Sequence, residues 1–199
     1  MTPILPSIYL ASTSPRRREL LEQIGVAYQV IGAPVDETPR GGEATEGYVL
    51  RMALEKARAG HGQAADKLHP VLGADTTVVV GGAVLGKPRD RADGIAMLRR
   101  LSGVTHHVYS GVALVVAGRE ATRLSVSAVS FREIAERECA AYWMSGEPAD
   151  KAGGYAIQGR GALFVVRLEG SYSGVMGLPL FETAELLREF GGDIWCGAA

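Results

Sequence analysis

The chain has 199 residues, a length usual for a single domain or a tight two-lobed unit, and we expect one domain over residues 1–199. Its composition, 47% hydrophobic and 22% charged, is ordinary for a soluble globular protein. Its 21 basic and 22 acidic side chains leave a formal net charge of −1, which argues against a nucleic acid as the main partner, because such binding needs many uncompensated cations. Two cysteines cannot build a disulfide scaffold, and neither a signal peptide nor a stretch of membrane-spanning length is apparent, so we expect a cytoplasmic protein without membrane contact.

Hydrophobic periodicity and turn residues predict strands that alternate with helices. In chain order, the predicted elements are a strand at 8–12, a helix at 15–24, a strand at 27–31, a helix at 45–59, strands at 71–80 and 83–85, a helix at 91–101, strands at 107–116 and 122–131, a helix at 134–145, a strand at 163–168 and a helix at 180–190. Ser14 and Thr45 are expected to cap the first two helices. Gly25 and Gly60 are expected to end them.

Two hairpins are predicted among these strands, with turns at Gly81-Gly82 and at Gly118. The segment between residues 146 and 154 is predicted to be a loop, because it is rich in glycine and proline. Helices alternating with strands, together with hairpins, indicate an α/β fold built on a mixed sheet.

The segment from Ser12 to Arg18 joins the first strand to the first helix and ends in three consecutive arginines. Cations in the first turn of a helix oppose its dipole, whereas the unpaired N–H groups there attract anions. Arginines in this place therefore favour a phosphate site. A solvated basic turn, paired with nearby glutamates, is the structural alternative.

Asp75 lies inside the apolar strand predicted at 71–80. Burying a carboxylate is costly unless it is paired, protonated or bound to a metal, so general-base or metal-binding chemistry would account for it. The alternative is an Asp at a strand edge that caps a neighbouring helix. A phospho-aspartyl phosphatase motif is discounted, because it needs a second Asp where this chain has Thr77.

Three separated lysines are further candidates. Lys87 follows the hairpin that carries Asp75 and could reach the same pocket. Lys56 lies near the expected C-terminal end of its helix, where a cation is favoured in any case, so a structural role would suffice. Lys151 belongs to the late glycine-rich segment.

That segment, residues 150–161, has four glycines within nine residues. Such a density of glycine indicates a backbone that turns sharply or approaches a ligand closely. Gln158 within it offers both a donor and an acceptor, which matches the edge of uracil or thymine. A plain polar loop is the alternative.

Two other pairs are assigned structural roles. His106 and His107 are adjacent in a strand, so their side chains point to opposite faces and cannot chelate one ion. Tyr142 and Trp143 are interpreted as packing residues of their helix rather than as a base-stacking platform.

Taken together, the segments resemble the Maf family of nucleotide pyrophosphatases. The matching stretches follow the family's order over nearly the whole chain: Leu10-Ala11-Ser12-Thr13-Ser14-Pro15-Arg16-Arg17, Glu55-Lys56-Ala57, Gly73-Ala74-Asp75-Thr76, Gly86-Lys87-Pro88, Leu101-Ser102-Gly103, Asp150-Lys151-Ala152-Gly153-Gly154-Tyr155 and Gln158-Gly159. One departure is Thr13, where the family often has glycine.

The resemblance implies an ITPase-like (Maf/Ham) fold, two lobes around a central cleft, often in a homodimer. It implies cleavage of a nucleoside triphosphate, here dTTP or UTP, into the monophosphate and pyrophosphate, with Mg²⁺ or Mn²⁺ as cofactor. The roles implied by position are a general base for Asp75, phosphate binding for Ser12, Arg16, Arg17, Lys56 and Lys87, metal binding for Glu37 with Asp75, and base preference for Arg16, Thr76 and Gln158.

The resemblance leaves other functions open. House-cleaning of the nucleotide pool is the activity we expect, including removal of modified pyrimidine nucleotides. A nucleotide-binding regulator of septum formation and cell division, without significant turnover, is the second hypothesis. An RNA-binding domain that uses the arginines after Pro15 is the third, and the balanced charge counts against it.

Overall fold

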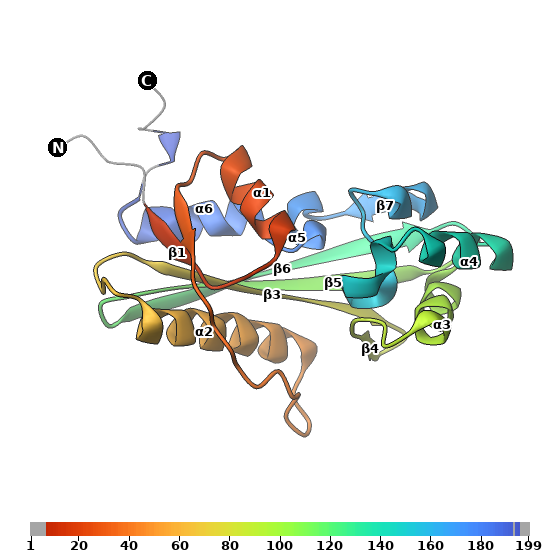
Figure 1. Ribbon diagram of the computed structural model, residues 1–199, viewed down its shortest axis with the longest axis horizontal. Coiled ribbons are helices and arrows are strands. Elements are labelled where there is room, and N and C mark those ends of the chain that lie inside the picture. Colours follow the sequence, from red (N-terminus) through yellow and green to blue (C-terminus); the bar gives the residue numbers. More distant parts are fainter. Residues whose placement is uncertain (1–6, 193, 196–199) are drawn as a thin grey trace. The chain divides into compact units, whose positions relative to one another are not determined.

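The computed structural model describes residues 7–192 and 194–195 (Figure 1). The strands are β1 (Ile8–Leu10), β2 (Tyr28–Val30), β3 (Val71–Val80), β4 (Ala83–Leu85), β5 (Thr105–Val116), β6 (Arg119–Phe131) and β7 (Val165–Glu169). The helices are α1 (Pro15–Gln23), α2 (Thr45–Gln63), α3 (Arg91–Leu101), α4 (Glu136–Met144), α5 (Tyr172–Met176) and α6 (Leu180–Glu189). Three short 3₁₀ turns complete the elements: η1 (Glu147–Asp150), η2 (Ala152–Gly154) and η3 (Arg160–Phe164).

The strands form a mixed sheet in the order β2-β1-β3-β5-β6-β7, with β4 paired to β3 outside this path. β1 runs parallel to both β2 and β3, whereas β4 is antiparallel to β3 and β7 antiparallel to β6. Parallel and antiparallel pairs in one sheet, with helices between the strands along the chain, confirm the predicted α/β class.

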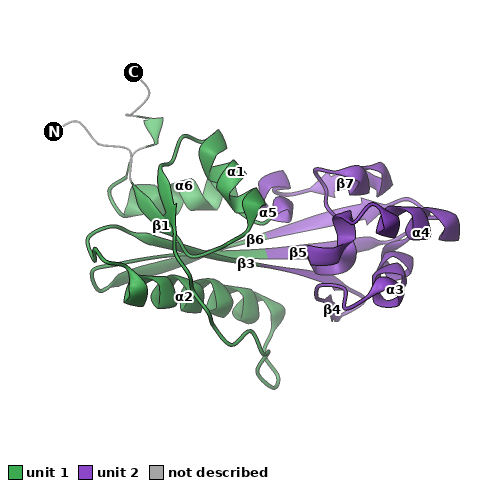
Figure 2. Ribbon diagram, viewed as in Figure 1, with its two compact units in different colours: residues 1–75, 110–125, 177–199 green, residues 76–109, 126–176 purple. Residues whose placement is uncertain are grey.

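Two compact units make up the chain, and Figure 2 colours them separately. The first unit contains residues 1–75, 110–125 and 177–199, and the second contains residues 76–109 and 126–176. Strands β3, β5 and β6 each have residues in both units.

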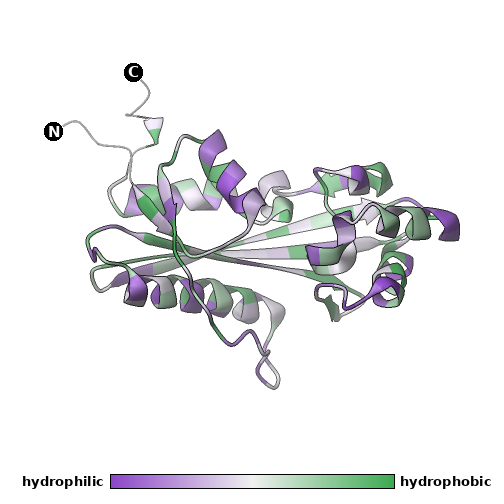
Figure 3. Cartoon of the chain, in the orientation of Figure 1, coloured by the Kyte–Doolittle hydropathy of each residue, from purple (hydrophilic) through white to green (hydrophobic). Residues whose placement is uncertain are grey.

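In the first unit, α2 lies directly on the strands because glycines face it. A Cβ atom on Gly73 of β3 would come within 2.2 Å of the Ala53 carbonyl oxygen, and one on Gly111 of β5 within 2.6 Å of the Val49 carbonyl oxygen. The helix has small residues on the facing side, and Ala53 and Ala57 are fully buried. Figure 3 shows hydrophilic residues recurring between hydrophobic ones along α2, as expected of a helix with one buried face.

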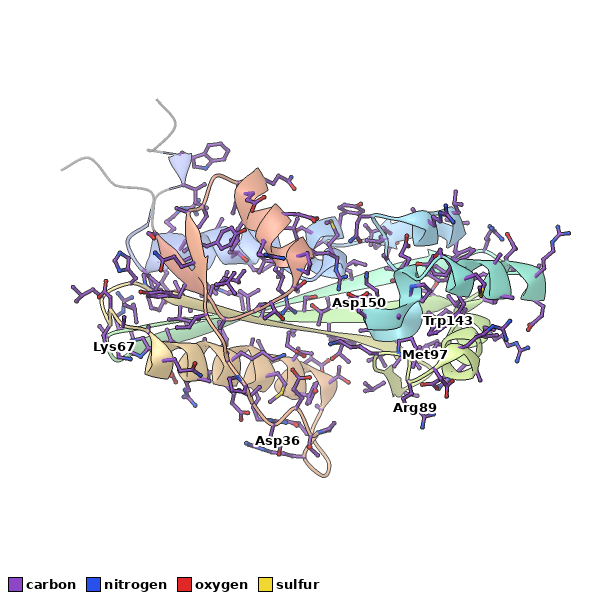
Figure 4. All side chains as sticks on the ribbon, in the orientation of Figure 1. Asp36, Lys67, Arg89, Met97, Trp143 and Asp150 are labelled. Carbon is purple, nitrogen blue, oxygen red and sulfur yellow. The ribbon has the colours of Figure 1, made fainter. Side chains whose placement is uncertain are left out.

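The second unit has its own apolar core, which gathers side chains from β3, β4, β5, β6, α3 and α4. Gly94 of α3 faces the Trp143 ring of α4, whose atoms would lie 2.3 Å from a Cβ on that glycine. Figure 4 labels Trp143 and the core residue Met97 at these two helices. Tyr142 is 5% exposed and belongs to the same core, which confirms the packing role assigned to the Tyr142-Trp143 pair.

Several predicted boundaries are wrong. Helix α2 continues through Gly60 to Gln63, because Gly60 is buried where a side chain would meet Val71, so it serves close packing and does not end the helix. Thr45 is the first residue of α2 rather than its cap. Ser14 occupies the N-cap position of α1, but its side chain makes no capping hydrogen bond.

Two further differences concern the C-terminal half. The strand predicted at 163–168 begins only at Val165, because the preceding residues form the turn η3. Helix α5 has only five residues, too few for a periodic pattern, and was not predicted. Within the described residues, no helix combines the length and apolar content required to cross a bilayer.

Candidate active site

A cluster of acidic and basic side chains around the buried Asp75 occupies the first unit where α2 meets β3. Lys56 of α2 places its Nζ atom 2.7 Å from Oδ1 of Asp75 and 2.7 Å from Oε1 of Glu37. Asp75 is 8% exposed, so its charge is compensated by this ammonium group rather than by bulk water. The close approach of α2 at Gly73, two residues before Asp75, sets the two side chains within reach of each other.

The structural reading of Lys56 as a cation at a helix end is wrong. Because α2 runs on to Gln63, Lys56 lies well inside the helix, away from its terminal carbonyl groups. Its side chain is only 12% exposed and bridges two carboxylates from different parts of the chain. The position is therefore occupied by a half-buried, paired lysine.

The N-terminal turn of α1 brings a guanidinium group to the same cluster. Arg17 donates from Nη1 to Ser12 Oγ at 3.0 Å and from Nε to the Gly177 carbonyl oxygen at 2.8 Å. Burial lowers the pKa of Arg17, and the nearby Asp75 carboxylate opposes that shift. Arg16 is close enough to Arg17 for its charge to lower the same pKa. Two arginines and a serine thus converge at a helix N-terminus, an arrangement that suits phosphate.

The loop that carries Glu37 is fastened to α2. Tyr48 donates its hydroxyl hydrogen to the Glu37 carbonyl oxygen at 2.9 Å, and Arg51 donates to the Thr38 carbonyl oxygen at 3.3 Å. Asp36, labelled in Figure 4, accepts a hydrogen bond from the Thr38 amide at 3.0 Å. Burial, with the charges of Asp75 and Glu37, raises the pKa of Tyr48 to about 12. Sequence reasoning did not single out Tyr48 or Arg51, since nothing in their spacing points to this loop.

Two carboxylates of this cluster are side chains of the kind that bind a divalent ion. Among residues 7–192 and 194–195, no three His, Cys, Asp or Glu side chains are grouped as a ready-made metal cage. Asp75 and Glu37 nevertheless bring oxygens to one ammonium group, so the two carboxylates converge on a point that attracts cations. Mg²⁺ characteristically takes one or two carboxylates and completes its shell with water and substrate phosphates.

Three predicted site residues, Thr76, Lys87 and Gln158, belong to the second unit. Lys87 is exposed on the loop after β4, and this loop is tied to the glycine-rich segment because the Gly153 amide donates to the Gly86 carbonyl oxygen at 3.0 Å. Gly153 has a φ of 72°, and a Cβ there would meet Val78 at 3.0 Å. Glycine is therefore required by both the backbone angle and the packing.

The neighbouring candidates in this unit differ in their surroundings. Gln158 is exposed, while the two residues before it are buried. Lys151 forms an ion pair with Asp150. His106 is fully buried and shares a hydrogen bond of 2.8 Å with the Tyr155 hydroxyl, whereas His107 is exposed. The histidines therefore point to opposite faces, as predicted, and His106 is a core residue.

Comparison with known proteins finds relatives that align with nearly the whole chain. The family described as Maf-like protein matches residues 7–190. A dTTP/UTP pyrophosphatase of Alkalilimnicola ehrlichii is 61% identical over 189 residues, covering 93% of each chain, and one of Saccharophagus degradans is 54% identical, covering 94% of this chain and 90% of the relative.

Among solved structures, the Ham1 protein of Staphylococcus aureus aligns with 65% of this chain and 72% of its own, at 20% identity and a TM-score of 0.43. The fold class rests on the strand pairing described above rather than on this alignment. The family match spans the elements that carry Ser12, Lys56 and Asp75, and the relatives match at more than half of the aligned positions. The chain belongs to the Maf family.

Proposed function

We propose that this protein hydrolyses dTTP and UTP to the corresponding monophosphate and pyrophosphate, as the names of its relatives state for those proteins. The observation that carries the proposal is the buried Asp75 carboxylate held beside Lys56 and Arg17. A triphosphate carries several negative charges, and cleaving it depends mainly on positioning and charge neutralisation.

Each side chain of the first-unit cluster has a proposed part in this reaction. Asp75 accepts a proton from the attacking water and acts as general base, while the hydrogen bond from Lys56 orients its carboxylate. Arg17 is held in place by Ser12 and by the Gly177 carbonyl, so its guanidinium is preorganised for phosphate oxygens.

A divalent cation, Mg²⁺ or Mn²⁺, is proposed as cofactor, with Glu37 and Asp75 as its protein ligands. When bound, such an ion neutralises phosphate charge and lowers the pKa of a coordinated water. Lys56 bridges the same two carboxylates, so its single positive charge offsets part of their negative charge. With the ion bound, Lys56 would add its positive charge to that of the ion near the phosphates.

The remaining assignments complete the proposal. Arg16 and Lys87 contribute further positive charge, and Thr76 and Gln158 contribute to the choice of base. The protein acts as one domain over residues 1–199 and forms a homodimer. It works on free nucleotides in the cytoplasm, including modified pyrimidine nucleotides, so that its physiological role is to clean the nucleotide pool.

A product analysis over a panel of nucleotides tests the function. The protein is incubated with dTTP, UTP, CTP and the purine triphosphates with Mg²⁺ or Mn²⁺, and pyrophosphate and orthophosphate are measured separately. Pyrophosphate from dTTP and UTP, in preference to the other nucleotides, is the expected result. Orthophosphate as the first product would contradict cleavage between the α and β phosphates. Tight binding of dTTP without turnover under either metal would favour the nucleotide-binding regulator instead.

A further inference from the structure

The segment that carries Gln158 is held from both sides by side-chain hydrogen bonds within the second unit. On one side, the Ala156 amide donates to the Tyr142 hydroxyl at 3.0 Å. On the other, Glu147 accepts hydrogen bonds from the amides of Arg160 at 2.9 Å and Gly161 at 3.1 Å. The backbone is therefore fixed two residues before Gln158 and again two and three residues after it.

The two anchoring side chains are joined to each other. The Tyr142 hydroxyl donates to Oε1 of Glu147 at 2.6 Å, which links the last part of α4 to the start of η1. A Cβ atom on Gly159 would lie 2.3 Å from Oε2 of Glu147, so only glycine lets the carboxylate approach the turn this closely. Tyr155, one residue before the anchored stretch, is in turn tied to the core by His106.

The Glu147 carboxylate is charged, and hydrogen-bond donors around it stabilise that charge. Burial acts to raise its pKa, but hydrogen bonds from Tyr142 and from the amides of Arg160 and Gly161 outweigh burial and leave the pKa lowered. Charge-assisted hydrogen bonds of this kind are stronger than neutral ones. Tyr142 has a raised pKa, first because of burial and second because of its bond to Glu147, so it remains a hydroxyl donor.

We propose that Glu147 and Tyr142 are positioning residues that set Gln158 for recognition of the pyrimidine base. The inference rests on the proposed function and extends it to two residues that do not themselves touch the nucleotide. Gln158 is exposed on a backbone whose neighbours Ala156 and Ile157 are buried, so its amide is presented from a rigid support. A single amide can distinguish uracil from cytosine only where its position is fixed, because hydrogen bonds weaken steeply with misalignment.

Variants of the anchoring pair test this role. Tyr142→Phe removes the hydroxyl that accepts from Ala156, and Glu147→Gln places an amide group where the carboxylate accepts from two backbone N–H groups. Glu138→Gln is the matched control, because the Glu138 carboxylate also accepts a backbone N–H, that of Ala135 at 2.9 Å, and lies on the same helix as Tyr142. Steady-state kinetics with UTP and CTP, Kd for non-hydrolysable α,β-imido-dUTP, and Tm are measured for each variant.

The two anchor variants are expected to raise KM for UTP by about three- to tenfold, as for loss of a hydrogen bond, with a smaller change in kcat. Their preference for UTP over CTP in kcat/KM is expected to narrow by a similar factor, whereas Glu138→Gln lowers Tm without changing that preference. If both anchor variants keep the wild-type KM and UTP preference while losing stability as the control does, the pair is only structural and the inference fails.

The binding measurement separates this inference from the proposed function. Wild-type protein that binds α,β-imido-dUTP but releases no pyrophosphate from dTTP or UTP would contradict the proposed reaction. In that case, weaker binding of α,β-imido-dUTP by Tyr142→Phe and Glu147→Gln than by Glu138→Gln would still support the positioning role. Equal binding by all three variants would contradict it.

Discussion

Replacing Gly73 by alanine is expected to push α2 away from β3 and to disturb the active-site cluster at the same time. The new Cβ would lie 2.2 Å from the Ala53 carbonyl oxygen and 2.6 Å from the Ala57 amide nitrogen, both below the 3.0 Å that real Cβ contacts respect. Because both atoms belong to the helix backbone, no side-chain rotation can relieve the clash. The helix must retreat by about 1 Å, which forfeits a large part of its dispersion contacts.

The cost follows from that retreat. Overpacking a core costs about 1–3 kcal/mol, and two backbone clashes place Gly73→Ala at about 3 kcal/mol. For a protein of this size, each kcal/mol shifts Tm by about 2–4 °C, so Tm should fall by about 6–12 °C. Activity at a temperature where the variant is folded should fall as well, because Lys56 moves with the helix away from Asp75.

Gly62→Ala provides the matched control, because a Cβ on this exposed glycine of the same helix meets nothing within 4 Å. It should gain about 0.5–1 kcal/mol from better helix propensity, so its Tm should rise. Calorimetry on the two variants and the wild type checks the predicted fall in Tm for Gly73→Ala and the predicted rise for Gly62→Ala. Pyrophosphate release by the same proteins checks the predicted loss of activity. A Gly73→Ala protein with wild-type Tm and activity would refute the packing argument.

Three other predictions concern charged and titratable groups. Arg17→Lys should raise KM for dTTP by about tenfold or more, because lysine lacks the planar group that Ser12 and Gly177 hold in place; an unchanged KM in steady-state kinetics would assign Arg17 a structural role. Glu37→Gln should raise the Mg²⁺ concentration needed for half-maximal activity, and an unaltered Mg²⁺ titration would contradict its role as a ligand. Burial lowers the pKa of His106 to about 4, with a smaller effect of His107, so the folded protein holds it neutral. In the unfolded chain the imidazole takes up a proton near pH 6.5, so protonation favours unfolding below that pH. The free energy of unfolding is therefore at its full value above about pH 6.5 and decreases as the pH falls toward 4, by about 2 kcal/mol between pH 7.5 and pH 5. Urea unfolding at both pH values should show this loss in the wild type and a smaller one in His106→Gln, and equal losses would contradict it.

The parts of the fold that the sequence predicted are those with local causes. Strand β3, strand β4 and helix α3 have the bounds expected from apolar runs, the Gly81-Gly82 turn and the Ser102-Gly103 stop. Glycine at position 60 misled the prediction, because its role depends on Val71, a residue of another element. Local patterns cannot distinguish a glycine that ends a helix from one that packs a helix onto a strand.

In the candidate site, too, residues with a local sequence signal were predicted, and contacts between distant elements were not. Asp75 was singled out because a carboxylate is unusual in an apolar strand, and Arg17 because arginines are unusual in the first turn of a helix. The ion pair of Lys56 with Asp75 and Glu37 depends on how α2 lies on β3, which no periodicity encodes. The same holds for Glu147, whose partners lie thirteen and fourteen residues further along the chain.

Asp75 is proposed to activate the water that cleaves the triphosphate, and the rate of pyrophosphate release by Asp75→Asn is the decisive test of this role. The measurement uses saturating dTTP and Mg²⁺, with circular dichroism to verify folding and with Asp66→Asn as control, since Asp66 is a loop residue that accepts from the Leu68 amide. We expect Asp75→Asn to be folded and slower by about 10²–10⁴-fold, with Asp66→Asn close to wild type. A folded Asp75→Asn protein that releases pyrophosphate at the wild-type rate would show that Asp75 is not the general base.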